Sequence, residues 1–186
     1  MTPALSHQTR ILVIVILAVS ALLILLSTQV TATMFGLFKK YDVHLSPEVH
    51  GIITNQGQPV KGVKVFRGLT YGNDDELLDE TLTDEDGRFS FAEKNIRSRK
   101  PGSMFDESRV RQMIDIDYQD KRYLLWGTLM IGIEPNLALT KRLTQLNCDL
   151  NDTEEYYEFE SIEYPHASHG VQSICRWLLY FKLTST

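Results

Sequence analysis

The sequence is poor in cysteine and lacks the short motifs of several enzyme classes. Only two cysteines occur among 186 residues, and no close Cys-x₂₋₄-Cys pair of a structural zinc site is present. The chain also lacks a phosphate-binding glycine loop and a dinucleotide fingerprint, and it has no Gly-x-Ser-x-Gly elbow of a serine hydrolase. These absences disfavour a nucleotide-dependent enzyme or a serine hydrolase.

Basic residues are not in excess. The chain holds 24 acidic and 19 basic residues, which gives a formal net charge of −5. Binding to nucleic acid requires a concentrated basic face, so we expect no nucleic-acid partner. The composition is 43% hydrophobic and 10% aromatic, which is typical of a folded domain rather than a disordered chain.

The chain has one long apolar run, Ile11 to Leu25, which contains no charged residue. Extended to about Val30, it would have the roughly 20 residues needed to cross the hydrocarbon core of a bilayer. A cleaved signal peptide is the alternative, whereas a soluble core helix would be apolar on every face. We therefore predict a transmembrane or signal helix over residues 1–33, which is either a signal anchor or a cleaved signal peptide. Translation from Met34 is a further alternative.

The location of the remaining chain depends on charges and cysteines. Arg10 precedes the apolar run and Lys39 and Lys40 follow it, so the positive-inside rule does not decide the orientation. Two cysteines favour a disulfide in an exported domain, and two reduced buried thiols are the alternative. We predict a Cys148–Cys175 disulfide in a single-pass inner-membrane protein whose domain faces the periplasm. Secretion to the periplasm after cleavage is the alternative location.

After a connector at 34–42, short apolar runs alternate with turn residues, which is typical of an all-β domain. We predict a mainly β fold, a β-sandwich over 43–183 that includes a C-terminal extension. The turn Asp84–Gly87 is expected to join two strands in a hairpin, and 93–103 to form a loop. Strands are expected at 49–54, 60–66, 80–83, 88–91, 110–118 and 123–129, and a short helix is expected after Pro135, with Leu139, Leu143 and Leu146 on one face.

Residues 50–91 carry a pattern that resembles a known type of module. It comprises GII at 51–53, GQPVKGVKV at 57–65 and TDEDGRFSF at 83–91. This pattern resembles the carboxypeptidase regulatory-like and transthyretin-like β-sandwich modules of exported bacterial proteins. The wider region of about 35–177, with its KKYDVHLSPEV segment, resembles a bacterial domain of unknown function. The resemblance implies a transthyretin-like β-sandwich that serves folding, packing or binding, and it carries over no catalytic residue.

Two sets of side chains have the chemistry of metal ligands but lack a diagnostic spacing. Thiolates and imidazoles suit zinc, and hard carboxylate oxygens suit calcium. We expect neither metal, no cofactor and no catalytic residue, and a hydrolase that uses the His166/His169 loop is an alternative. The zinc set is Cys148, His166, His169 and Cys175, and the calcium set is Asp74, Asp75, Asp84 and Asp86.

Residues 152–164 hold six acidic residues, four aromatic residues and no basic residue. Aromatic anchors among charged residues are typical of protein interfaces. We take Tyr156, Tyr157 and Glu158 as the candidate partner surface; the alternative is an irregular solvated edge that turns Phe159 inward. The sequence thus predicts a non-enzymatic protein that binds another protein at the cell envelope, such as an immunity-type protector. A structural envelope module without a dedicated partner is the alternative.

Overall fold

A computed structural model describes residues 7–36, 39–103, 105–164 and 166–177. The chain divides into two units, Met1–Lys40 and Tyr41–Thr186, and each is described by itself. In the first unit, helix α1 spans His7–Gly36, so the predicted N-terminal helix is present. The described side chains from Ile11 to Ile24 are exposed on all sides of this helix. Within the described ranges, no helix meets the length and apolarity required of a membrane span.

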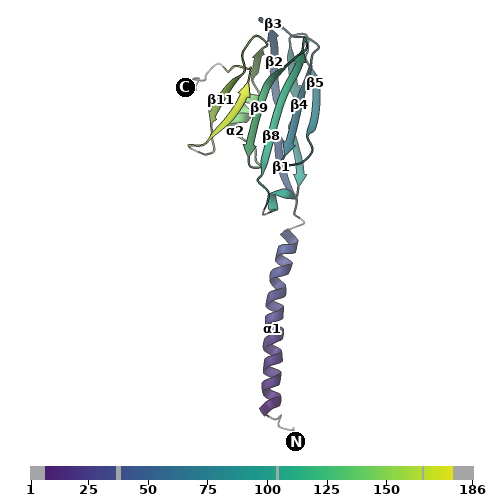
Figure 1. Ribbon diagram of the computed structural model, residues 1–186, viewed down its shortest axis with the longest axis vertical. Helices are drawn as coiled ribbons and strands as arrows, with labels where there is room; N and C mark the ends of the chain where they lie inside the picture. Colours follow the sequence, from purple (N-terminus) through teal and green to yellow (C-terminus); the bar gives the residue numbers. More distant parts are fainter. Residues whose placement is uncertain (1–6, 37–38, 104, 165, 178–186) are drawn as a thin grey trace. The chain divides into compact units, whose positions relative to one another are not determined.

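The second unit is mainly β, as predicted. Its largest sheet has six strands in the order β11-β12-β9-β8-β4-β5, and all neighbouring strands are antiparallel. Figure 1 shows the long strands β4, β8 and β9 side by side, with β11 and β5 toward opposite edges. The bounds are β4 Lys64–Tyr71, β5 Leu77–Leu82, β8 Arg109–Tyr118, β9 Lys121–Ile131, β11 Glu155–Glu160 and β12 Ser168–Ser173.

Two smaller sheets complete the β-sandwich-like unit. In the first, β2 pairs in parallel with β10 and antiparallel with β3 and β6. In the second, β1 pairs antiparallel with β7. The bounds are β1 Tyr41–Ser46, β2 Val49–Asn55, β3 Gln58–Pro59, β6 Arg88–Phe91, β7 Lys94–Ser98 and β10 Leu146–Asp149, with a 3₁₀ turn η1 at Lys100–Gly102.

One hydrophobic core is shared by all three sheets and by the short helix α2, Leu137–Leu143. Leu45 of β1, Ile53 of β2 and Ile114 of β8 are buried in this core. Helix α2 begins after Asn136, whose side-chain oxygen accepts a hydrogen bond from the Leu139 amide at 2.9 Å. The predicted helix is therefore confirmed, except that Leu146 already belongs to β10.

The predicted hairpin at Asp84–Gly87 is wrong. β5 pairs with β4, whereas β6 pairs with β2, so this turn carries the chain from the large sheet to a smaller one. The local turn chemistry is nevertheless present, because Asp84 Oδ1 accepts the amides of Asp86 and Arg88 at 2.9 and 2.8 Å. Turn residues specify where the chain reverses, but they do not specify which strand it pairs with next.

Other boundaries also differ from the predictions. The chain from Val60 to Val63 is not a strand, because Gly62 adopts φ +70° before β4 begins at Lys64. Residues 93–103 contain β7, and β1, β10 and β12 were not predicted. The predicted connector 34–42 is too long at both ends, since α1 reaches Gly36 and β1 begins at Tyr41.

Strand β8 carries one polar residue, Gln112, among its core-facing side chains. Gln112 lies on the core face, where its amide donates to the Leu45 carbonyl at 2.7 Å and accepts from Trp126 Nε1 at 3.1 Å. A bulge in β9 leaves Leu125 without a cross-strand partner, so Leu125 and Trp126 are both buried. The pattern of β8 is therefore regular, with one fully hydrogen-bonded polar residue in the core.

Candidate partner-binding site

The three residues predicted as a partner surface lie on two opposite faces of β11. Strand residues alternate between faces, and Glu155, Tyr157 and Phe159 point inward. Tyr156 and Glu158 point outward with Glu160. Tyr157 is therefore half-buried on the opposite face from Tyr156 and Glu158, and the partner surface itself stays a prediction. The alternative was right in turning Phe159 inward, but β11 is a regular strand rather than an irregular edge.

On the inner face, aromatic rings pack around Trp177. Tyr157 and Phe159 lie parallel with ring centroids 6.0 Å apart, and each meets Trp177 edge to face, at 5.1 and 5.3 Å. Trp126 meets the same ring at 6.0 Å. Such offset and edge-to-face arrangements are the favourable ones for aromatic pairs. The inner face of β11 is therefore part of the core.

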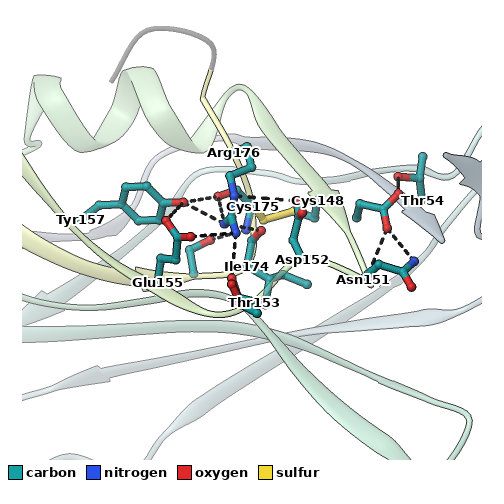
Figure 2. Close-up of polar contacts among 12 residues, drawn as sticks. Thr54, Cys148, Asn151, Asp152, Thr153, Glu155, Tyr157, Ile174, Cys175 and Arg176 are labelled. Atoms are coloured by element: carbon teal, nitrogen blue, oxygen red, sulfur yellow. Dashed lines mark hydrogen bonds and ion pairs between the residues drawn. A yellow bond between two sulfur atoms is a disulfide. The ribbon is translucent and has the colours of Figure 1, made fainter. Parts of the chain in front are cut away.

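Arg176 neutralises the acidic residues beside this aromatic cluster (Figure 2). Its guanidinium donates to the Tyr157 hydroxyl at 2.8 Å and to the Thr153 carbonyl at 2.9 Å. It also pairs with Glu155 at 3.3 Å and with Asp152 at 3.8 Å. Burial raises the pKa of Tyr157, although the neighbouring Arg176 charge acts in the opposite direction. These contacts attach the chain after β12 to the start of β11.

The two cysteine sulfur atoms lie at disulfide distance beneath Arg176. Cys148 comes from β10, Cys175 follows β12, and both are fully buried. Sulfur atoms joined to each other are not available as thiolate ligands, so the zinc set of the sequence analysis is not assembled. In the part of the chain that the structure describes, no group of three or more metal-binding side chains occurs.

The two histidines have different surroundings. His169 belongs to β12, and its Nε2 lies 2.7 Å from the Asn136 side chain, which caps α2. His166 is exposed in the preceding turn, with φ +74°. The described contact of His169 therefore serves the helix cap rather than a nucleophile.

The four aspartates of the calcium set lie at opposite ends of β5. Six residues separate the two turns as a strand, which corresponds to roughly 20 Å. Asp74 pairs with Lys100 at 2.5 Å, and Asp86 pairs with Arg88 at 2.5 Å. These carboxylates therefore stabilise two separate turns.

Among the carboxylates of the described chain, Asp149 has the pKa that lies furthest from its usual value. Its hydrogen bonds have a structural role. It accepts hydrogen bonds from Thr54 Oγ1 at 2.8 Å, from the Gly57 amide at 2.8 Å and from the Asn151 amide at 2.9 Å. Burial alone would raise the pKa of Asp149, but these hydrogen bonds outweigh it and hold the pKa far below its usual range. Asp149 thereby fixes the turn after β2 to the end of β10.

The outer face of the six-stranded sheet has a depression near its centre, because the glycines there carry no side chain. One row across the sheet reads Tyr156, Gln172, Gly127, Met113, Gly68 and Leu78. The Tyr156 ring lies over Gly170, where an added Cβ would overlap the ring, and Leu124 lies similarly over Gly127. Large side chains can lie flat on this face because the neighbouring glycines have no side chain.

A shallow hollow of about 430 Å³ opens over this glycine floor. Its apolar lining comes from Met113, Leu124, Leu129 and Tyr156. Leu129 is 56% exposed and Tyr156 is 60% exposed. The solvated face of an antiparallel sheet is ordinarily polar, so apolar residues on its central strand are informative.

A second hollow of about 740 Å³ adjoins the first and shares Arg111 and Leu129 with it. It extends to Phe105, which is 89% exposed, and to the basic residues Lys100 and Arg109. The two hollows are adjacent, because they share Arg111 and Leu129, and together they reach from Tyr156 to Phe105. We call the two hollows together the outer groove.

The composition of residues 152–164 predicted Tyr156 and Glu158 as site residues, but no prediction included Leu129, Leu124, Met113 and Phe105. A signal was present in β9, where the run LLWGTLMI is apolar at both alternating sets of positions. In an antiparallel sheet, such a strand has apolar residues left over for the outer face. The bulge at Leu125 obscured which residues these would be.

The comparisons with known proteins identify the family. Residues 49–153 match the family model of the domain of unknown function DUF6795. This match covers more than half of the chain, so the chain belongs to this family. No curated protein and no solved structure matches it. The matched range covers most of the β unit but ends before β11.

Proposed function

We propose that this chain is a non-enzymatic, exported β-sandwich protein of transthyretin-like type that binds another protein at the cell envelope. The observation that carries the proposal is the outer groove, in which exposed Tyr156 and Phe105 stand at the two ends and Met113, Leu124 and Leu129 give the hollow beside Tyr156 an apolar lining. Exposed aromatic residues around an apolar centre are the usual composition of a protein interface. An immunity-type protector against a delivered toxin is one concrete form of this function.

The side chains of the outer groove suit a partner that lies across the strands. Leu129 is common to both hollows and therefore stands at the centre, and Ile131 beside it on β9 is 81% exposed. Met113 adds an unbranched side chain that adapts to different partner shapes. A segment seated here would cover apolar surface that the folded chain leaves in water.

Two features support placing the domain outside the cytoplasm. The charge-free run Ile11–Leu25 suits a membrane anchor or a signal peptide. A disulfide between Cys148 and Cys175 would persist in an oxidising compartment. We propose a single-pass inner-membrane protein with a periplasmic domain, and a secreted periplasmic form after cleavage is the alternative.

Site-specific photo-crosslinking tests the binding function. A photoreactive phenylalanine analogue replaces Leu129 in the full chain, produced in its own cells, and replaces Leu78 in the control. Leu78 is also exposed on the outer face but does not line the groove. We expect a discrete crosslinked protein from position 129 and none from position 78. A structural module or a hydrolase would give no such product.

The captured partner then allows a quantitative test. Leu129→Ser and Tyr156→Ala should each weaken binding at least tenfold without changing the melting temperature, because both side chains are exposed. Leu78→Ser is the matched control and should bind normally. Equal affinity of all four proteins would rule out the outer groove as the binding site.

Two measurements test the proposed location. Protease added to sealed inner-membrane vesicles of known orientation shows on which side the domain lies. Intact mass of protein from its native compartment, with and without reductant, shows whether the leader is retained and whether the cysteines are joined. Two free thiols would contradict the exported location.

A further inference from the structure

Five of the six acidic residues of the segment 152–164 divide into two groups with different roles. Arg176 pairs with Asp152 and Glu155. Glu163 accepts the Leu137 amide at 2.6 Å and a hydroxyl from Ser161 at 3.1 Å. The hydrogen bond from the Leu137 amide lowers the pKa of Glu163. These three carboxylates are therefore satisfied within the chain.

Glu158 and Glu160 belong to the other group. Both are exposed on the outer face of β11, on the same side as Tyr156. Among the residues that the structure describes, neither carboxylate has an ion-pair partner or a hydrogen-bond donor. Their charge is therefore left for solvent or for a partner to neutralise.

The register of β11 and β12 places this charge beside the outer groove. Glu158 lies opposite Gly170, which forms part of the groove floor, and Glu160 lies opposite Ser168 one step farther along. Tyr156 and Glu158 are two residues apart on one strand and thus point to the same face. An occupant that contacts Tyr156 comes within reach of Glu158.

The other end of the groove differs, because its basic residues already have acidic partners. Lys100 pairs with Asp74, Arg109 with Glu107 and Arg111 with Glu76. At this end ion pairs cancel the basic charge, whereas at the β11 end the charges of Glu158 and Glu160 are negative and have no ion-pair partner among the described residues.

We propose that the outer groove binds a protein segment that is basic as well as apolar. One or more Lys or Arg side chains lie beside Glu158 and Glu160, and aliphatic or aromatic side chains cover Leu129 and Met113. This assignment rests on the proposed function and names the chemistry of its partner. Complementary charge speeds association and suppresses binding of acidic segments.

Selection from a library of random 12-residue peptides tests the partner chemistry. The full chain in detergent micelles is the target, and only peptides whose binding is lost with Leu129→Ser are analysed further. We expect these peptides to contain more Lys and Arg than Asp and Glu. Their affinity should fall at least tenfold for the double variant Glu158→Lys/Glu160→Lys and should also fall as salt is raised.

The control reverses the same number of charges away from the groove. Glu48 and Asp75 are exposed and do not line it, so Glu48→Lys/Asp75→Lys should change peptide affinity less than twofold. Replacing the peptide's lysines by glutamates should restore binding to the Glu158→Lys/Glu160→Lys variant. This reciprocal exchange excludes a folding defect as the cause of lost binding.

The outcomes separate the two proposals. Leu129-dependent peptides without a basic excess, or with unchanged affinity for the charge-reversed variant, would overturn the basic partner and leave the binding groove standing. Recovery of no Leu129-dependent peptide would overturn both.

Discussion

The two faces of β11 have similar composition but differ in burial. The inner face holds Glu155, Tyr157 and Phe159, where each ring is packed and the charge is paired with Arg176. The outer face holds Tyr156, Glu158 and Glu160, which the chain leaves exposed. The difference shows that an acidic aromatic stretch is not one surface. A two-residue period divides it into residues that stabilise the fold and residues that stay exposed to solvent.

The largest expected difference between the faces comes from truncating their rings. Phe159→Ala should lower the free energy of unfolding by about 3–5 kcal/mol, because it leaves a cavity in a closely packed core. Tyr156→Ala should lower it by less than about 0.5 kcal/mol, because the ring lies on the surface. Urea unfolding of both variants checks this. Similar losses of unfolding free energy for the two variants would contradict the difference between the two faces.

The cysteine pair beneath the inner face should have the next largest effect. Cys148→Ser/Cys175→Ser opens a loop with a sequence separation of 27. Loss of that cross-link should cost roughly 3–4 kcal/mol of stability in the chain-entropy model. Equilibrium unfolding of the oxidised wild type and the double variant measures the cost. The variant should match the reduced wild type, and equal stability of the oxidised and reduced wild type would contradict the prediction.

Hydrogen-bonded and exposed carboxylates should also differ in how they change the stability of the fold with pH. Asp149 has a lowered pKa in the folded state, so it stabilises the fold above its unfolded pKa of about 3.9. That contribution is lost as the pH falls below about 4 toward the folded pKa. Asp149→Asn should cost about 1–3 kcal/mol at pH 7, and the cost should shrink at lower pH.

Glu158→Gln is the matched control for this experiment. It should change stability little at any pH, because the Glu158 carboxylate has no partner in the described chain. Thermal unfolding from pH 7 to pH 3 provides the measurement. A constant cost of Asp149→Asn over this range would show that its charge is not what holds the turn.

The smallest difference concerns two hydroxyl groups. The Tyr157 hydroxyl accepts from Arg176 and donates to the Cys175 carbonyl at 3.2 Å. Tyr157→Phe should cost about 1 kcal/mol, whereas Tyr156→Phe should cost almost nothing. Chemical denaturation of both variants resolves a difference of this size. A larger effect at Tyr156 would place that residue in the fold rather than in the interface.

Local patterns predicted those parts of the fold that depend on local interactions. Short apolar runs between turn residues predicted β2, β6, β8 and β9, and Pro135-Asn136 predicted the start of α2. Pairing between distant segments was not accessible. The Asp84 turn has correct turn residues but joins different sheets, and β10 pairs in parallel with β2 across nearly a hundred residues. No local signal encodes such partners.

The candidate site was predicted only in part for a similar reason. Composition drew attention to Tyr156 and Glu158, but the assignment of faces requires the register of β11 on β12. Leu129 and Phe105 come from segments far away in the sequence, and the tertiary fold brings them into one groove. A bulge at Leu125 shifted the alternation that would have placed Leu129 outside.

The position of β12 has a consequence for biosynthesis. β12 comes late in the chain, yet it lies between β9 and β11 in the large sheet. Until residues 168–173 have left the ribosome, β9 presents an unpaired edge that other chains can join. Pairings between distant segments also form slowly. The large sheet can therefore be completed only after β12 has been synthesised.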